Sequence, residues 1–353
     1  MPLVEGSLEA SAKAALDPDV WHYVNRGAGG DVSVDEATAA WRRYRFRPRV
    51  LRDVRRVETD LDLFGHWRTP IGIAPSAFHR LYTPDGELAT AAAALACGAP
   101  MVLSSRTTTR LEEVAAVING PWWFQVYVMR EPSITAATVR RARDAGASAL
   151  VLTGDTPYVG YVPPTGTARP LPLTDELALA NVAEHLPAAG VDDIWELIDQ
   201  DAGITTDTIG WLANESGLPV IVKGILRGDE AVRCVEAGAS GVWVSNHGGR
   251  QLDRALPTAQ ALPDVVNAIA GQVPVIVDGG IRCGADALAA LALGASAVFL
   301  GRPVIWGLAT DGQAGAERVV AAVTDQLRHA MGLAGAVDLA GLDPSLVLRV
   351  SAG

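Results

Sequence analysis

The sequence predicts an α/β fold in which eight parallel strands close into a (β/α)8 barrel, the TIM barrel. Short apolar segments alternate with alanine-rich amphipathic segments along most of the chain. Three amphipathic segments end in similar four-residue sequences, in which a glycine C-cap directly precedes a strand: Asp144-Ala-Gly-Ala147, Glu236-Ala-Gly-Ala239 and Ala292-Leu-Gly-Ala295. Strict alternation favours a parallel sheet, and eight regular units favour closure over an open doubly wound sheet.

Each predicted strand is a short apolar run bounded by glycine, proline or polar residues. The eight runs are residues 71–75, 101–105, 122–128, 149–155, 219–223, 241–246, 274–279 and 297–301. The amphipathic segments predict helices over residues 86–96, 111–117, 133–145, 205–215, 228–237, 259–269, 284–293 and 316–331. We expect residues 1–69 to form an N-terminal cap of short helices that closes part of the barrel, within one domain over residues 1–353.

The connection after the fourth strand is far longer than the usual βα loop of about two to six residues. It is rich in proline and predicts at most small helical pieces. Because it leaves the carboxyl end of a strand, we expect residues 156–203 to form a lid over the active-site face.

Composition excludes several classes of partner. The formal net charge of -11 argues against nucleic acid or an anionic membrane surface, because both require clustered Lys and Arg. The basic cluster at residues 41–56 is a local exception, more probable as a solvated face or a subunit contact. The apolar stretch 88–103 is too short and too broken by Gly98 and Pro100 to cross a bilayer.

The cysteines and the first residues predict a compartment. Three widely spaced cysteines argue against a disulfide framework and against a zinc site, so we expect no metal and a reducing cytoplasm. The first 20 residues lack a basic start followed by an apolar core, so we expect no secretory signal.

Polar residues and glycines gather at the carboxyl ends of the predicted strands, where barrels place their chemistry. They are Ser104, Ser105, Gln125, Tyr127, Thr153, Asp155, Lys223, Ser245, Asn246, His247, Arg250, Asp278, Gly280, Arg282, Gly301 and Arg302. The last two strands end in Val-Asp-Gly-Gly-Ile-Arg (277–282) and Leu-Gly-Arg-Pro (300–303). Glycine amides beside an arginine at these two strands favour a phosphate site, although either turn alone fits a plain turn almost as well.

Two further features indicate catalysis. Lys223 ends an apolar strand, and a buried lysine requires an anionic or electron-rich partner, such as an electron-accepting ring, unless it only extends toward solvent. His247 and Asp155 supply a base and a carboxylate that can charge it, while Arg250 can clamp a substrate carboxylate. A lone histidine is more often structural, but this one lies at a strand tip beside Gly-Gly and Arg.

The segment Ser245-Asn-His-Gly-Gly-Arg-Gln251 resembles the signature of the FMN-dependent 2-hydroxy-acid oxidases and dehydrogenases. The neighbouring segments 72–77, 125–127 and 152–157 resemble the same family. Within it, residues 78–87 and the compact length look most like the bacterial 4-hydroxymandelate oxidases. The resemblance implies a TIM barrel that binds FMN through Ala74, Pro75, Ser76, Ala77, Ser104, Gln125, Thr153, Lys223, Ser245, Asp278, Gly280, Arg282, Gly301 and Arg302.

The resemblance also implies the reaction, which is oxidation of an aromatic 2-hydroxy acid to the 2-oxo acid with oxygen as acceptor. His247 would take a proton, Asp155 would stabilise the imidazolium, and Tyr127 would hold the hydroxyl. Arg250 and Tyr23 would hold the carboxylate. The substrate contacts would come from Tyr23, Tyr127, His247, Arg250 and Tyr161. A homotetramer is implied as well.

One departure from the family pattern concerns the lid. The family usually has a segment like Asp-x-Pro-x-x-Gly-Arg-Arg, whereas this chain reads Asp155-Thr-Pro-Tyr-Val-Gly-Tyr-Val162. Losing one charge-assisted contact would weaken carboxylate binding by ~1.5 to 3 kcal/mol. One alternative is therefore the same flavin chemistry on an unusual alcohol, amine or modified peptide. Two readings are independent of the lid: a flavin-free phosphate-binding lyase or isomerase, and a non-catalytic flavin-storing or scaffold protein, the weakest option because the acid–base pair would be superfluous.

Overall fold

The computed structural model describes residues 6–163, 171–186 and 194–350. An eight-stranded parallel sheet runs in the order β4-β11-β10-β9-β8-β7-β6-β5. A parallel bridge between Ile73 and Met101 joins the two ends of that order, so the sheet closes into a barrel and the predicted fold is confirmed. The strands are β4 (Ile71–Ile73), β5 (Val102–Ser104), β6 (Trp122–Val126), β7 (Ala147–Thr153), β8 (Val220–Ile225), β9 (Gly241–Val244), β10 (Val275–Val277) and β11 (Ala297–Leu300).

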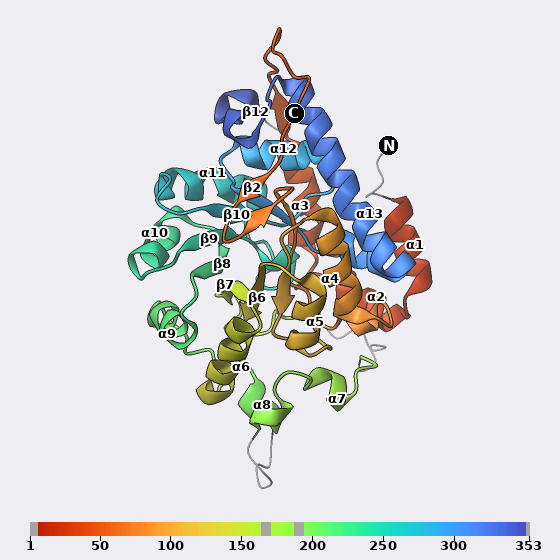
Figure 1. Cartoon of the computed structure of the whole chain (residues 1–353), viewed down its shortest axis with the longest axis vertical. Helices are drawn as coiled ribbons and strands as arrows, with labels where there is room; N and C mark the ends of the chain where they lie inside the picture. Colours follow the sequence, from red (N-terminus) through yellow and green to blue (C-terminus); the bar gives the residue numbers. More distant parts are fainter. Residues whose placement is uncertain (1–5, 164–170, 187–193, 351–353) are drawn as a thin grey trace.

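Helices surround this barrel (Figure 1). They are α4 (Gly86–Cys97), α5 (Leu111–Ile118), α6 (Pro132–Asp144), α9 (Asp207–Ser216), α10 (Gly228–Glu236), α11 (Thr258–Ile269), α12 (Gly284–Ala292) and α13 (Arg302–Ala334). The first seven agree with the predicted helices to within a few residues at either end. The eighth begins earlier than predicted, directly after β11, and leaves helical geometry at Asp311 and Gly312. That internal break disrupts the periodicity, which is why the sequence predicted only the second part.

The side chains of the strands divide into two cores, because successive residues of a strand point to opposite faces. Trp123, Trp243 and Phe299 fill the inside of the barrel, with the Trp243 and Phe299 rings 4.4 Å apart. Val242 and Val244, on either side of Trp243, pack outward against the helices. The interior is therefore filled below the carboxyl ends of the strands, which leaves those ends as the place for a site.

The N-terminal cap is only partly helical. Its helices are α1 (Ser7–Ala15), α2 (Pro18–Asn25) and α3 (Val32–Trp41). The predicted helices are present, and two strand pairs that the sequence did not predict accompany them: β1 (Tyr44–Phe46) pairs with β12 (Val347–Arg349), and β2 (Leu61–Asp62) pairs with β3 (His66–Trp67). Leu63 and Trp67 of the β2–β3 hairpin pack into the barrel interior. Pairing with a distant strand and burial inside the barrel stabilise these segments, and neither is visible in local periodicity.

Within its described residues, the predicted lid contains three short helical pieces: α7 (Asp175–Ala178), η2 (Ala183–His185) and α8 (Ile194–Ile198). Helices α7 and α8 lie at the lower end of Figure 1. Residues 164–170 and 187–193 of the predicted lid lie outside the described residues. The end of the segment is attached to the barrel, because Arg130 N donates to Asp199 O and Ile198 packs with Met129 and Ile134.

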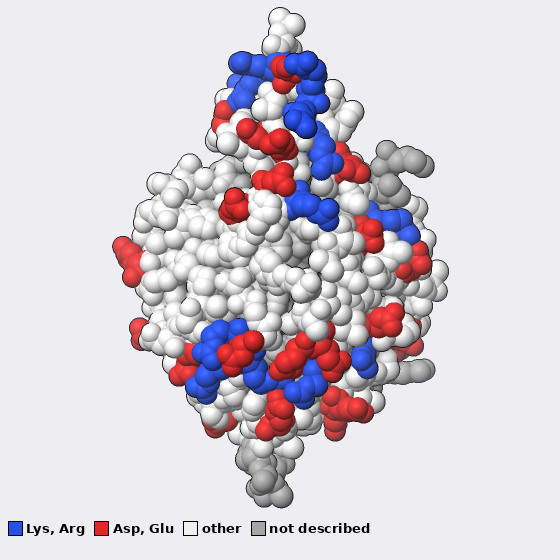
Figure 2. All heavy atoms as spheres, viewed as in Figure 1, with Lys and Arg blue, Asp and Glu red and all other residues white. Residues whose placement is uncertain are grey.

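On the face seen in Figure 2, positive and negative side chains are mixed rather than separated. Figure 2 shows Lys and Arg at the upper end of the molecule interspersed with Asp and Glu, and a central face with few charges. In the basic cluster, Arg49 pairs with Asp343, and Arg55 pairs with Asp53 at 2.6 Å. None of the described helices is long and apolar enough to cross a membrane.

Candidate active site

A cavity of about 410 Å³ opens at the carboxyl ends of the barrel strands. Most of the residues that the sequence singled out line it: Tyr23, Ala74, Pro75, Ser76, Ala77, Ser104, Gln125, Tyr127, Thr153, Lys223, His247, Arg250, Asp278, Gly280, Arg282, Gly301 and Arg302. They come from all eight strand ends and from helix α2. Closure of the sheet therefore brings together residues that are up to 279 positions apart (23 to 302).

A histidine and a carboxylate form a dyad at one side of the cavity. His247 Nδ1 lies 3.0 Å from Asp155 Oδ1, and His247 Nε2 lies 3.4 Å from the Tyr127 hydroxyl. Burial by itself raises the pKa of the Asp155 carboxyl, but the charge and hydrogen bond of His247 and the charge of Lys223 more than offset this and lower the pKa. Asp155 is thus an anion behind the imidazole, which leaves Nε2 as the ring nitrogen for a ligand.

The turn that carries His247 has an unusual backbone. His247 has a φ of 57°, and Gly248 and Gly249 follow with φ of 64° and 76°. A Cβ on Gly249 would lie 2.9 Å from Val34 atoms, so glycine is required for the first turn of α3 to approach. A left-handed conformation is strained for a non-glycine residue and is found preferentially at functional sites. Gly249 therefore lets the N-terminal cap pack on the catalytic turn, while Gly248 lies next to the Arg302 guanidinium.

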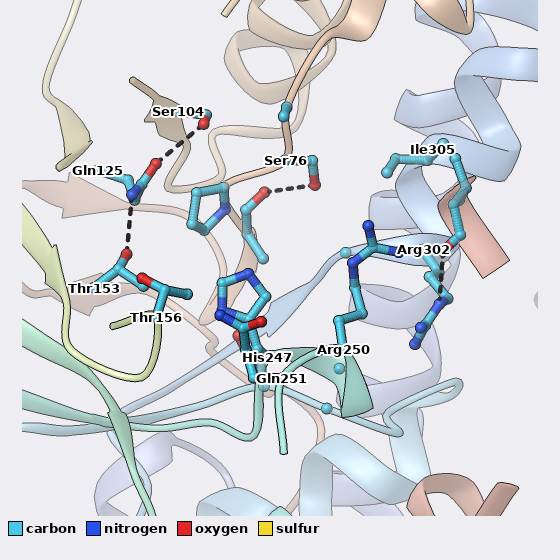
Figure 3. A pocket seen from close by; sticks show the side chains of 18 of the residues that line it. Ser76, Ser104, Gln125, Thr153, Thr156, His247, Arg250, Gln251, Arg302 and Ile305 are labelled. Atoms are coloured by element: carbon cyan, nitrogen blue, oxygen red, sulfur yellow. Dashed lines mark hydrogen bonds between the residues drawn. The ribbon is translucent and has the colours of Figure 1, made fainter. Parts of the chain in front are cut away.

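Arg250 is held by that same cap. Its Nη1 donates to the backbone carbonyls of Tyr23, Val24 and Arg26, at the carboxyl end of α2. Its guanidinium carbon lies 4.9 Å from the centre of the Tyr23 ring. These contacts fix the guanidinium beside the dyad, where Figure 3 shows His247 and Arg250 next to each other.

Lys223 is neither free nor directed to solvent. Its Nζ lies 3.1 Å from Asp278 Oδ2 and donates to Ser245 Oγ at 2.8 Å, while Ser245 Oγ donates to Asp278 Oδ1 at 2.7 Å. The ammonium also lies 5.5 Å from the centre of the Trp243 ring. The pair and the tryptophan offset the cost of burying a lysine with only 6% of its side chain exposed.

A row of hydrogen-bonding side chains forms one end of the cavity. Ser104 Oγ donates to Gln125 Oε1 at 3.0 Å, and Gln125 Nε2 donates to Thr153 Oγ1 at 2.9 Å. Arg302 lies at the other end, with His247 and Arg250 between (Figure 3). The row offers buried donors and acceptors from the tips of three neighbouring strands.

The opposite end is cationic. Arg302 donates to the carbonyls of Val24 and Arg26 at 3.1 and 3.2 Å. Burial, together with the charges of Arg250 and Arg282, lowers the pKa of Arg302 to about 9. Beside it, helix α13 begins at Arg302, and a Cβ on Gly301 would meet nothing within 4 Å. Crowded guanidinium groups next to a helix N-terminus and open space suit a phosphate.

These two ends fit a flavin mononucleotide. The polar row matches the donors and acceptors of a flavin pyrimidine ring, and the arginines match a phosphate dianion. The two ends belong to one continuous cavity.

Five of the residues that the sequence singled out do not line the cavity: Ser105, Asp155, Tyr161, Ser245 and Asn246. Asp155 lies behind His247, and Ser245 lies behind Lys223, so both contact residues of the wall. Tyr161 is 70% exposed, and its backbone carbonyl accepts from Gly29 N. Its neighbours Val159, Gly160 and Val162 line the cavity instead.

The sequence did not single out several lining residues, among them Phe78, Tyr82, Arg106 and Phe299. Arg106 directly follows the strand tip Ser104-Ser105, so extending the search by one residue would have found it. Tyr82 lies nine residues beyond β4 and donates to Ala77 O, so only the folded loop brings it to the site.

Known proteins match the chain over nearly its whole length. Residues 12–349 match the family described as FMN-dependent dehydrogenase. An L-lactate oxidase of Nostoc sp. is 41% identical over 351 residues, which cover 96% of each chain. A 4-hydroxymandelate oxidase of Amycolatopsis orientalis is 41% identical over 333 residues, which cover 93% of each chain.

Solved structures match equally well. Mandelate oxidase with benzoyl-formic acid is 37% identical, with a TM-score of 0.85 over 97% of this chain and 96% of that one. A mandelate oxidase mutant with the C4a-OH-FMN adduct is 37% identical, with a TM-score of 0.89 over 98% of this chain and 100% of that one.

These matches confirm the resemblance found in the sequence, the FMN cofactor and the class of enzyme, an oxidoreductase that acts on the CH–OH group of 2-hydroxy acids. They overturn the flavin-free alternative. With a closed barrel and a histidine–aspartate dyad at its mouth, the chain belongs to the FMN-dependent dehydrogenase family, among the 2-hydroxy-acid oxidases.

Proposed function

We propose that the protein oxidises an aromatic 2-hydroxy acid, of the mandelate or 4-hydroxymandelate type, to the 2-oxo acid and passes the electrons to oxygen. The observation that carries the reaction is the convergence of the His247–Asp155 dyad, Tyr127 and Arg250 on one cavity. Aromatic side chains in the same wall support an aromatic substrate, with the Tyr23 and Phe78 rings 6.4 Å apart. The relatives named for mandelate and 4-hydroxymandelate support it too.

The cofactor would be held at both ends of the cavity. Gln125, Ser104 and Thr153 would bind the flavin pyrimidine, and Lys223 would lie near the ring. The phosphate would be bound by Arg282 and Arg302 with the amides around Gly280 and Gly301. Segment 74–77 would pack on the ring, and Ser245 and Asp278 would position Lys223. When bound, FMN supplies the two-electron acceptor, and the protein supplies orientation and acid–base groups.

His247 accepts the substrate proton in this proposal. Its Nδ1 faces the Asp155 carboxylate, so the proton arrives at Nε2. The lowered pKa of Asp155 keeps that group ionised at neutral pH, and its charge stabilises the imidazolium that forms. Burial and the Asp155 charge raise the pKa of Tyr127, so its hydroxyl keeps its proton and can donate to the substrate oxygen.

Arg250 and Tyr23 would bind the substrate carboxylate. Within the described residues, backbone carbonyls engage only Nη1 of Arg250, which leaves Nε and Nη2 for a bidentate contact. Tyr161 was expected to contribute, and its exposed side chain could do so only after rotating toward the cavity.

Anaerobic reduction tests the proposal. The purified holoenzyme is mixed with mandelate or 4-hydroxymandelate without oxygen, and the flavin absorbance is followed. We expect the yellow colour to bleach, then return with formation of peroxide when oxygen is admitted. If the enzyme binds flavin but no 2-hydroxy acid bleaches it, the proposed reaction is wrong. If oxygen does not restore the flavin absorbance and another electron acceptor does, the proposed role of oxygen is wrong.

Assembly and location are further proposals. We propose a homotetramer, to be tested by light scattering on the holoenzyme, with a monomer as the contrary result. A cytoplasmic location is proposed from the cysteine pattern, and cell fractionation would test it.

A further inference from the structure

Arg106 is a cation in the cavity wall that the proposed reaction does not use. It lines the cavity directly after β5 and is partly buried. Its Nη2 donates to the carbonyl of Ile198, at 2.7 Å. Nearby Asp199 is paired instead with Arg130, at 3.2 Å. No carboxylate in the described part of the chain forms an ion pair with Arg106, and most of its five N–H donors remain available to a ligand.

The position of Arg106 in the barrel indicates which part of a substrate it meets. In the closed ring of eight strands, β5 lies four places from β9 in either direction, so the two strands face each other across the barrel. The turn after β9 carries His247 and Arg250. A substrate held there through its hydroxyl and carboxylate must point its third substituent away from both, toward the wall from which Arg106 extends.

Of the five other lysines and arginines that line the cavity in the described part of the chain, four have assigned partners, and the fifth, Arg26, follows α2 near Arg250. Lys223 pairs with Asp278. In the proposed function, Arg282 and Arg302 bind the phosphate and Arg250 binds the substrate carboxylate. Arg106 is therefore the cation on the β5 side of the cavity that can bind one more acceptor. Its bond to Ile198 ties the guanidinium to the end of the lid segment, which fixes its direction before a ligand arrives.

We propose that Arg106 makes the enzyme select a 2-hydroxy acid whose far end carries a hydrogen-bond-accepting, preferably ionised, group. This inference rests on the proposed function and adds the specificity of the same site. On an aromatic substrate the group is a substituent of the ring opposite the α-carbon. Arg106 acts on substrate choice and takes no proton.

Three matched substrates test the inference: 4-carboxymandelate, 4-hydroxymandelate and 4-methylmandelate. In anaerobic stopped-flow experiments, the wild-type enzyme should reduce its flavin with the carboxylate most efficiently, roughly 10- to 100-fold above the methyl compound, the range of one charged hydrogen bond. Arg106→Leu should abolish that preference with little loss on 4-methylmandelate, and Arg106→Lys should retain part of it. Arg110→Leu removes an exposed charge four residues away, outside the cavity lining, and should leave the preference intact.

Two results would overturn the inference. One is a wild-type enzyme without preference for the charged ring. The other is an Arg106→Leu variant that loses all three substrates equally, because Arg106 would then bind the common carboxylate. If none of the compounds reduces the flavin, the proposed function fails separately. Binding of 4-carboxy- and 4-methylbenzoylformate, measured by the change in flavin absorbance, then still reports whether Arg106 selects the charged ring.

Discussion

Glu87 is a buried carboxylate that joins two loops of the active site. It lies in the first turn of α4 and is fully buried. Its Oε1 accepts from the amides of His79 and Thr108 at 3.0 and 2.9 Å, and its Oε2 accepts from the hydroxyls of Thr108 and Thr109 at 2.7 and 2.8 Å. These partners follow β4 and β5, next to Phe78 and Arg106 of the cavity wall.

We expect Glu87→Gln to lower the free energy of unfolding by about 2 kcal/mol, because charged hydrogen bonds contribute ~1.5 to 3 kcal/mol and neutral ones ~0.5 to 1.5. The amide oxygen keeps both backbone donors, and the two hydroxyls can turn to accept from the amide nitrogen. Glu87→Ala leaves two buried N–H groups without an acceptor, so we expect a larger loss of roughly 2 to 6 kcal/mol.

Urea titration at pH 7, followed by tryptophan fluorescence, measures both variants. Glu113→Gln is the control, because Glu113 is exposed on α5. A Glu87→Gln variant within about 0.5 kcal/mol of wild type, the range of ordinary surface changes, would refute the reasoning.

The ionisation of Glu87 also predicts that the free energy of unfolding depends on pH. Burial raises the pKa of Glu87, but the charge of His79 and the hydrogen bonds from Thr108 and from the His79 amide more than offset it, so the folded pKa lies below the usual 4.5. The stabilisation is therefore fully present above pH 4.5 and is lost as the pH falls through the folded pKa. The difference between wild type and Glu87→Gln should shrink over that interval, and a constant difference would contradict this assignment.

Three further variants probe the site and its support. His247→Ala should retain flavin, because its ring contacts Asp155 and Tyr127, but should lose flavin reduction by substrate by several orders of magnitude; normal turnover would remove it from the mechanism. Arg302→Leu should weaken FMN binding at least tenfold, measured by fluorescence of released flavin, because a charged contact contributes ~1.5 to 3 kcal/mol; unchanged affinity would place the phosphate elsewhere. Gly72→Ala should destabilise the barrel by roughly 1 to 3 kcal/mol in a thermal melt, because the new Cβ would lie 2.3 Å from the Phe299 ring, and an unchanged melt would show that the ring moves freely.

The sequence alone determined the barrel and much of the candidate site. Strand and helix periodicities are local properties, and parallel strands must expose their carboxyl ends on one face, so residues such as Gln125, Lys223 and His247 were predicted to meet. The structure places all three in the wall of one cavity.

Only the tertiary structure decided which loops complete the site. Backbone carbonyls of α2 bind Arg250, which lies more than 220 positions further along the chain. Residues of the β2–β3 hairpin pack into the barrel interior, and a hydrogen bond to a backbone carbonyl of the lid orients Arg106. None of these contacts produces a periodic pattern in the sequence. They depend on which surfaces meet after the barrel closes, and no short window of sequence contains both partners.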